Sequence, residues 1–126
     1  MRYLLDSTLL IDHANGDAPA AELLQRLFEE GHELYTCDVV TCEVLSRGTD
    51  AELRHIRVLL DALEYVATSP DAARRAGEAR RARHLGGGKR SLADALIGGI
   101  ALELESTVVT RNRPDFERQG IPVLSY

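Results

Sequence analysis

Short apolar runs alternate with helical patterns along this chain of 126 residues, and no tight hairpin turn joins one run to the next. Antiparallel strands can be joined by two residues, whereas parallel strands need a crossover connection that is usually a helix. The alternation therefore predicts an α/β fold, with a central and mainly parallel sheet covered by helices on both faces. No linker or internal repeat divides the chain, so we expect one domain over residues 1–126.

The expected strands cover 3–5, 34–36, 65–67, 107–110 and 122–124. Between them, apolar side chains recur at the three- and four-residue spacing of helices that bury one face. The expected helices cover 8–14, 18–30, 38–47, 51–63, 71–84 and 91–103. Gly98 and Gly99 lie inside the last of these, where a glycine costs roughly 1 kcal/mol relative to alanine, so we expect close backbone packing there. In such sheets ligands bind beyond the carboxyl ends of the strands, which directs attention to the residues that follow them.

Four acidic residues occupy positions that the fold could bring to this edge of the sheet. Asp6 follows the first strand, Glu43 lies in an otherwise apolar helix, Asp94 is near the start of another helix, and Asp115 follows the fourth strand. Each also has an ordinary interpretation. Asp6 could cap a helix, Glu43 could pair with the arginine four residues later, Asp94 could belong to a capping box, and Asp115 could form a turn.

Considered as a set, the four acids point to bound metal. Carboxylates gathered at one place repel one another unless cations lie between them. Mg²⁺ takes oxygen ligands and is commonly held by a few carboxylates together with water and substrate phosphates. Two such ions about 4 Å apart can activate a water and stabilise the leaving oxygen when a phosphodiester is displaced. The acids therefore predict metal-dependent phosphodiester chemistry.

The charge distribution is uneven. The chain has a net charge of -5, but residues 1–66 carry 5 basic and 13 acidic side chains, whereas residues 67–126 carry 10 and 7. Seven basic residues and one acid lie between Arg74 and Arg90. This stretch could be a solvated helix face, but its single sign favours contact with phosphates. The candidate RNA-binding residues are Arg80, Arg81, Arg83, Lys89 and Arg90. No apolar run is long enough to cross a membrane, and we expect a cytoplasmic protein.

The chain resembles PIN-domain proteins, and most closely the VapC-type toxins of prokaryotic toxin–antitoxin pairs. The similar segments are Leu4–Asp12, Thr41–Leu45, Ala93–Gly98 and Val108–Phe116. The resemblance implies a three-layer α/β/α sandwich and an Mg²⁺- or Mn²⁺-dependent endoribonuclease that cleaves RNA with a metal-activated water. It also implies that the catalytic, metal-binding acids are Asp6, Glu43 and Asp94, with Asp115 as a more variable fourth.

The same resemblance implies roles for polar neighbours of the metal and for partner proteins. By position, Ser7 and Thr110 are similar to residues beside the metal, and Asn112 is similar to one that helps to bind it. A cognate antitoxin that blocks the site and a homodimer are also implied. Two features depart from the family pattern. Asp6-Ser7-Thr8 replaces the commoner Asp-Thr-Asn or Asp-Thr-Ser, and the triple glycine at 86–88 is unusual.

Two alternatives of other classes remain. The first is a catalytically inactive PIN-like module that binds RNA or protein. The presence of all four candidate catalytic acids argues against it. The second is a receiver-type signalling domain, which is similar in architecture but needs a lysine after a late strand. The only lysine in this chain is Lys89, outside any expected strand. Metal-dependent RNA cleavage distinguishes the enzyme from both.

Overall fold

The computed structural model describes residues 1–126 and places a five-stranded sheet at the centre of the molecule. The strands are β1 (Arg2–Leu5), β2 (Glu33–Cys37), β3 (Glu64–Val66), β4 (Thr107–Val109) and β5 (Val123–Leu124). Their order in the sheet is β3-β2-β1-β4-β5, and every neighbouring pair is parallel. The sequence-based prediction of a mainly parallel sheet is therefore confirmed.

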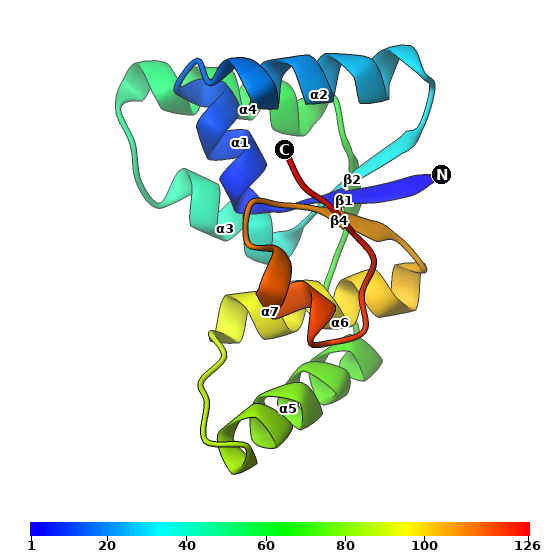
Figure 1. The fold of residues 1–126 in the computed structure, drawn as a ribbon. Helices are drawn as coiled ribbons and strands as arrows, with labels where there is room; N and C mark the ends of the chain where they lie inside the picture. Colours follow the sequence, from blue (N-terminus) through cyan, green and yellow to red (C-terminus); the bar gives the residue numbers. More distant parts are fainter.

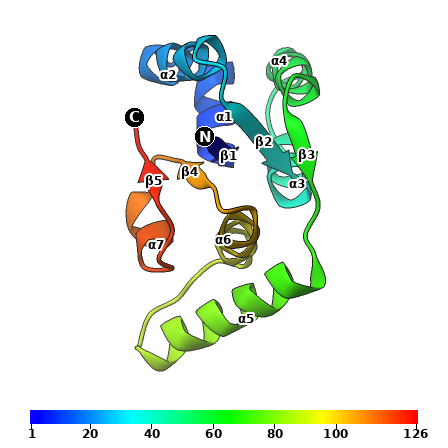
Figure 2. The ribbon, with the colours of Figure 1, turned by 90° about the vertical axis from the view of Figure 1, so that its right-hand side faces the viewer.

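Helices cover both faces of this sheet, as predicted for a three-layer sandwich. Figures 1 and 2 show α1 (Ser7–Ala14), α2 (Ala18–Glu29) and α4 (Asp50–Asp61) on one face. The other face carries α6 (Leu92–Leu104), and α5 (Pro70–Leu85) packs on the outer side of α6. The two remaining helices, α3 (Asp38–Leu45) and the short α7 (Arg113–Glu117), follow β2 and β4. None of the helices is both long and apolar enough to span a membrane.

The central strands are buried on both faces, which explains their uninterrupted apolar sequences. Leu4 and Leu5 of β1 and Val108 and Val109 of β4 have no exposed surface. Because consecutive side chains of a strand point to opposite faces of the sheet, these strands supply apolar surface to both layers of helices. The largest fully buried side chain is that of Phe116 in α7, which anchors this short helix to the core.

The two glycines of α6 lie where other segments approach the helix closely. A Cβ atom built on Gly99 would overlap the backbone carbonyl oxygen of Ala72 in α5, and one built on Gly98 would overlap the side-chain amide of Gln119. The expected close packing at these positions is therefore present. It lets α5 approach α6 more closely than alanine at position 99 would permit.

Candidate metal centre

The candidate site lies where the course of the chain across the sheet reverses direction. From β1 the chain continues to β2 and then β3 on one side, and it returns to place β4 on the other side of β1. Because the strands are parallel, their carboxyl ends share one edge, at which α1, α3 and the segment before α7 meet (Figure 1). Such a switch point is the usual ligand site of an open α/β sheet.

Asp6 is the most enclosed acid at this edge, with 2% of its surface exposed. One carboxylate oxygen, Oδ1, accepts a hydrogen bond from the backbone N–H of Ser7 (2.9 Å), so Asp6 also caps α1. The other oxygen, Oδ2, accepts from the hydroxyls of Thr110 (2.7 Å) and Thr8 (3.3 Å). Burial raises the pKa of Asp6, and the hydrogen bonds from Thr110, Ser7 and Thr8 offset this rise only in part.

Thr110 joins the ends of the two central strands. Its side chain is fully buried, and its hydroxyl accepts from the backbone N–H of Asn112 (2.9 Å) while donating to Asp6. Thr8 lies beside it, with its Oγ1 3.4 Å from that of Thr110, and accepts from the backbone N–H of Arg111 (3.3 Å). Thr8 was not among the site residues predicted from the sequence, although its place two residues after Asp6 was a signal that could have suggested this contact.

Glu43 of α3 faces Asp6 and carries the clearest sign of a missing counter-charge. Its Oε1 atom is buried and has no hydrogen-bond partner. Burial is the main cause that raises the pKa of Glu43, and repulsion from Asp6 and then Asp94 raises it further. The alternative ion pair with Arg47 does not form. A buried carboxylate oxygen without a donor is costly, so this position favours a cation as its partner.

Asn112 links the two remaining acids. Its side-chain amide, through Nδ2, donates to Asp94 Oδ2 (3.3 Å) and to Asp115 Oδ2 (2.8 Å). Burial raises the pKa of Asp94, and repulsion from Asp6 is the next cause. Asp115 is more exposed and also pairs with Arg118 (3.2 Å). Asp94 thus belongs to the same electrostatic cluster as Asp6 and Glu43, whereas Asp115 lies at its outer side.

Gln119 contacts the backbone of two of the acids and was not identified from the sequence. Its Nε2 donates to the backbone carbonyls of Asp94 (3.4 Å) and Asp115 (3.3 Å), so it connects α6 to α7. A glutamine beyond a five-residue helix carries no local pattern that predicts such a contact. It depends on how α7 folds back against α6.

The chemistry of these donors fits a hard divalent cation. All of them are oxygen atoms, and the buried Oε1 atom of Glu43 has no partner. Burial raises the pKa of Asp6, Glu43 and Asp94, and neighbouring acids raise it further for Glu43 and Asp94. No three His, Cys, Asp or Glu side chains are already placed as ligands of one ion. Mg²⁺ does not need such a cage, because it retains several waters and commonly uses only one or two carboxylates.

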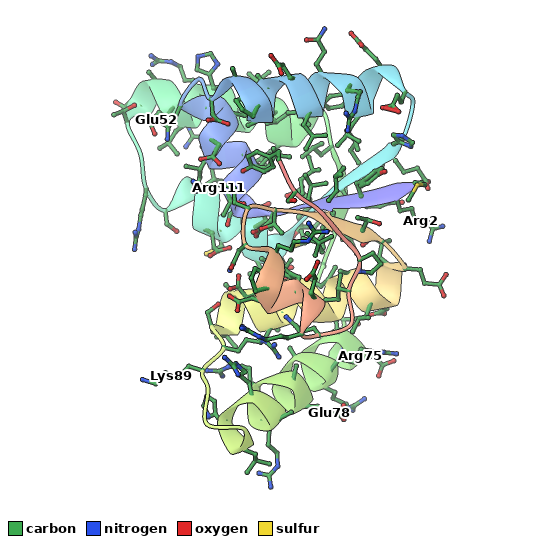
Figure 3. The ribbon with its side chains drawn as sticks, in the orientation of Figure 1. Arg2, Glu52, Arg75, Glu78, Lys89 and Arg111 are labelled. Atoms are coloured by element: carbon green, nitrogen blue, oxygen red, sulfur yellow. The ribbon has the colours of Figure 1, made fainter.

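The candidate RNA-binding residues lie beyond α6 rather than among the acids. Arg80, Arg81 and Arg83 belong to α5, and Figure 3 shows Lys89 extending from the loop between α5 and α6. Arg90 differs from the other four because it is buried. Its guanidinium donates to the backbone carbonyls of Ala79 (3.1 Å) and Asp115 (3.4 Å), so it ties this loop to both α5 and α7.

Comparisons with known proteins agree with this fold. The family model described as the PIN domain matches residues 3–121. The chain is 30% identical over 111 residues to ribonuclease VapC19 of Mycobacterium tuberculosis, covering 86% of this chain and 87% of that protein. Among solved structures, a chain of the VapBC2 complex of Rickettsia felis bound to promoter DNA is 20% identical with a TM-score of 0.85, covering 100% and 99% of the two chains. A toxin–antitoxin complex from Klebsiella pneumoniae contains a chain that is 26% identical, with a TM-score of 0.74 and coverage of 97% and 95%.

Proposed function

Because the chain belongs to the PIN-domain family, we propose that residues 1–126 act as a single PIN domain that cleaves RNA as a metal-dependent endoribonuclease. The relative that is 30% identical is named a ribonuclease, which supports this activity. The observation that carries the proposal is the buried Oε1 atom of Glu43, which has no hydrogen-bond partner at a place where Asp6 raises the pKa of both Glu43 and Asp94. The complete set of acids speaks against a PIN-like module that only binds.

We assign the metal to Asp6, Glu43 and Asp94, with Asp115 at the outer side of the site. When bound there, Mg²⁺ or Mn²⁺ would lower the pKa of a water and stabilise charge on the leaving oxygen of the phosphodiester. Thr110, with Ser7 and Thr8, fixes the orientation of the Asp6 carboxylate through hydrogen bonds. Preorganised ligands of this kind lose little conformational freedom when the cation and RNA arrive.

Asn112 has a positioning role in this proposal. It holds Asp94 and Asp115 through one amide group, and its own backbone is held by Thr110. Asp6, Asp94 and Asp115 are therefore connected through Thr110 and Asn112 rather than by direct contact, whereas Glu43 takes no part in these hydrogen bonds. This connection holds the three carboxylates in place for a cation that would offset their charge.

We also propose that the protein is the toxin of a toxin–antitoxin pair, that a cognate antitoxin covers the acidic site, and that the chain forms a homodimer. The similarity to a chain of the Klebsiella complex supports an antitoxin partner. For the dimer, α4 exposes one large apolar side chain. Its Ile56 and Leu59 are buried, but Val58 is 73% exposed beside a cavity of about 460 Å³.

The proposed activity is tested with Asp6→Asn and Asp94→Asn, each incubated with total cellular RNA and Mg²⁺ or Mn²⁺. Each variant removes a ligand charge while preserving side-chain size, so we expect cleavage to fall by at least about 100-fold. Asp61→Asn is a matched control, because Asp61 is an exposed acid at the end of α4. Near wild-type cleavage by either site variant would overturn the metal assignment, and no metal-dependent cleavage by the wild type would overturn the proposed activity.

A further inference from the structure

A cavity of about 500 Å³ lies between α5, α6 and the end of α7, outside the acidic cluster. Four arginines contribute to its wall, and Glu78 is its only acid. The arginines are Arg75 and Arg83 of α5, Arg90 of the following loop, and Arg118 at the end of α7. Figure 3 shows Arg75 and Glu78 on α5, and Lys89 on the adjoining loop. This concentration of one sign of charge in a concave site favours an anion as its occupant.

Most of these arginines have no acidic partner. Arg75, Arg83 and Arg90 form no ion pair, and only Arg118 does, with Asp115. Arg90 is only 9% exposed, and its Nε atom is buried without a hydrogen-bond partner. A buried cation beside other cations is costly, and a bound anion would relieve that cost.

Glycines shape the wall of this cavity. A Cβ atom at Gly88 would overlap the guanidinium group of Arg83, so Arg83 lies directly against the backbone of the loop. Gly99 of α6 is also part of the wall. Gly88, which the acidic site does not explain, thus has a role here: it leaves space for the Arg83 guanidinium.

We propose that this cavity is a phosphate-binding subsite, which holds a phosphate group of RNA while the acidic site acts on a neighbouring part of the strand. Its use in RNA recognition rests on the proposed ribonuclease activity. Arginine suits the task because its planar guanidinium can donate two hydrogen bonds to one phosphate. A free phosphate or a mononucleotide presents the same group, so the two sources have to be separated by experiment.

The cavity and the acidic site are neighbours, because two residues that line the cavity also contact the backbone of the acids. Gln119 lines the cavity and donates to the backbone carbonyls of Asp94 and Asp115. Arg90 also lines the cavity and donates to the carbonyl of Asp115. Arg90 also lines a second cavity, of about 620 Å³, together with Arg80 and Lys89. The basic surface therefore continues from α7 to the loop before α6.

The test compares Arg75→Gln and Arg83→Gln with Arg74→Gln. Arg74 is a matched control because it lies on the same helix, carries the same charge, does not line the cavity and pairs with Asp71. Purified protein in EDTA is titrated with inorganic phosphate and with a short oligoribonucleotide. Chloride at equal ionic strength is the reference. Binding is followed through the arginine Nε–H signals in NMR spectra and through fluorescence anisotropy of the labelled RNA.

We expect Arg75→Gln and Arg83→Gln each to weaken phosphate and RNA binding by about ten-fold, the effect of losing one charge-assisted hydrogen bond. The slope of log affinity against log salt for RNA should fall by about 0.7 for each lost contact. The Arg90 Nε–H signal should shift when phosphate is added to the wild type. Gly88→Ala provides a second variant that keeps every charge but displaces the Arg83 guanidinium, and it should also weaken binding.

Weaker binding of both ligands, with Arg74→Gln unchanged, supports a subsite for RNA. Weaker binding of phosphate alone supports the same subsite with a free phosphate or mononucleotide as its ligand. Equal effects of Arg74→Gln and Arg75→Gln, or an unchanged Arg90 signal, would overturn the proposal in favour of a diffuse field of charge or an acidic partner protein. Because EDTA prevents metal-dependent cleavage, this outcome is independent of whether the protein proves to be a ribonuclease.

Discussion

The close approach of α5 to α6 can be tested by replacing the two adjacent glycines of α6 separately. Gly98 and Gly99 are both buried in the same helix, so Gly→Ala should bring each the same gain in helix propensity, about 1 kcal/mol. Their surroundings differ. The new Cβ atom would overlap a backbone carbonyl, that of Ala72, at position 99, but only the end of the Gln119 side chain at position 98.

This difference determines the expected magnitudes. The Ala72 carbonyl can move only if α5 shifts, and overpacking of this kind typically costs about 1–3 kcal/mol. After the propensity gain of about 1 kcal/mol is subtracted, Gly99→Ala should lose up to about 2 kcal/mol, or up to about 8 °C in Tm for a domain of this size. The Gln119 side chain can rotate, and its two hydrogen bonds are long at 3.4 and 3.3 Å. Gly98→Ala should therefore stay close to the wild type.

Thermal and urea unfolding, both followed by circular dichroism in EDTA, measure the effect directly. The midpoints of wild type, Gly98→Ala and Gly99→Ala are compared at the same protein concentration. A Gly99→Ala midpoint at or above that of the wild type would refute the argument from the Ala72 contact. So would an equal loss in both variants, because the explanation depends on a rigid obstacle at one position and a flexible one at the other.

Two further predictions concern the acidic site and the assembly. Glu43→Gln should raise the free energy of unfolding of the metal-free protein at pH 7, because a raised folded-state pKa makes the ionised carboxylate destabilising. This gain should disappear as the pH falls below the ordinary range of the glutamate pKa. Thermal denaturation should also show that Mg²⁺ stabilises the wild type more than the variant. Equal Mg²⁺ stabilisation of both would contradict the ligand assignment. Light scattering at tens of micromolar should give the mass of a dimer for the isolated chain. Val58→Asp should give the mass of a monomer, because it places a charge on the exposed side of α4 where Val58 lies. A monomeric wild type would refute the dimer.

Strand ends and helix spacing were readable from the sequence because they are local properties. The run Tyr3-Leu4-Leu5 before Asp6 predicted a buried strand followed by a polar group, and the structure has this arrangement. The helix α7 was not predicted, since its five residues are too few to display an apolar period. The family membership that the resemblance implied is confirmed by the PIN-domain match.

Other features depend on contacts between distant segments and could not be predicted. The basic run suggested an exposed role for Arg90, but the residue is buried because α7 returns to cover it. The sequence marked Gly98 and Gly99 as costly in a helix without naming Ala72 and Gln119 as the groups that approach them. The positions of the four acids were predicted, whereas the bridging contacts of Asn112 follow only from the folded geometry.

The hydrogen bond between Thr110 and Asp6 has a consequence for how the protein matures during synthesis. It joins residues 104 positions apart, and β1 has β4 as its neighbour on one side. A growing chain emerges from its N-terminus, so β1, α3 and their acids are made long before β4. Until the segment after β4 has been released, Asp6 lacks Thr110, and Asp94 lacks Asn112. The cluster is therefore assembled only after β4 and the segment that follows it have been made, and the proposed metal assignment predicts that a ribosome-bound fragment ending before β4 does not cleave RNA.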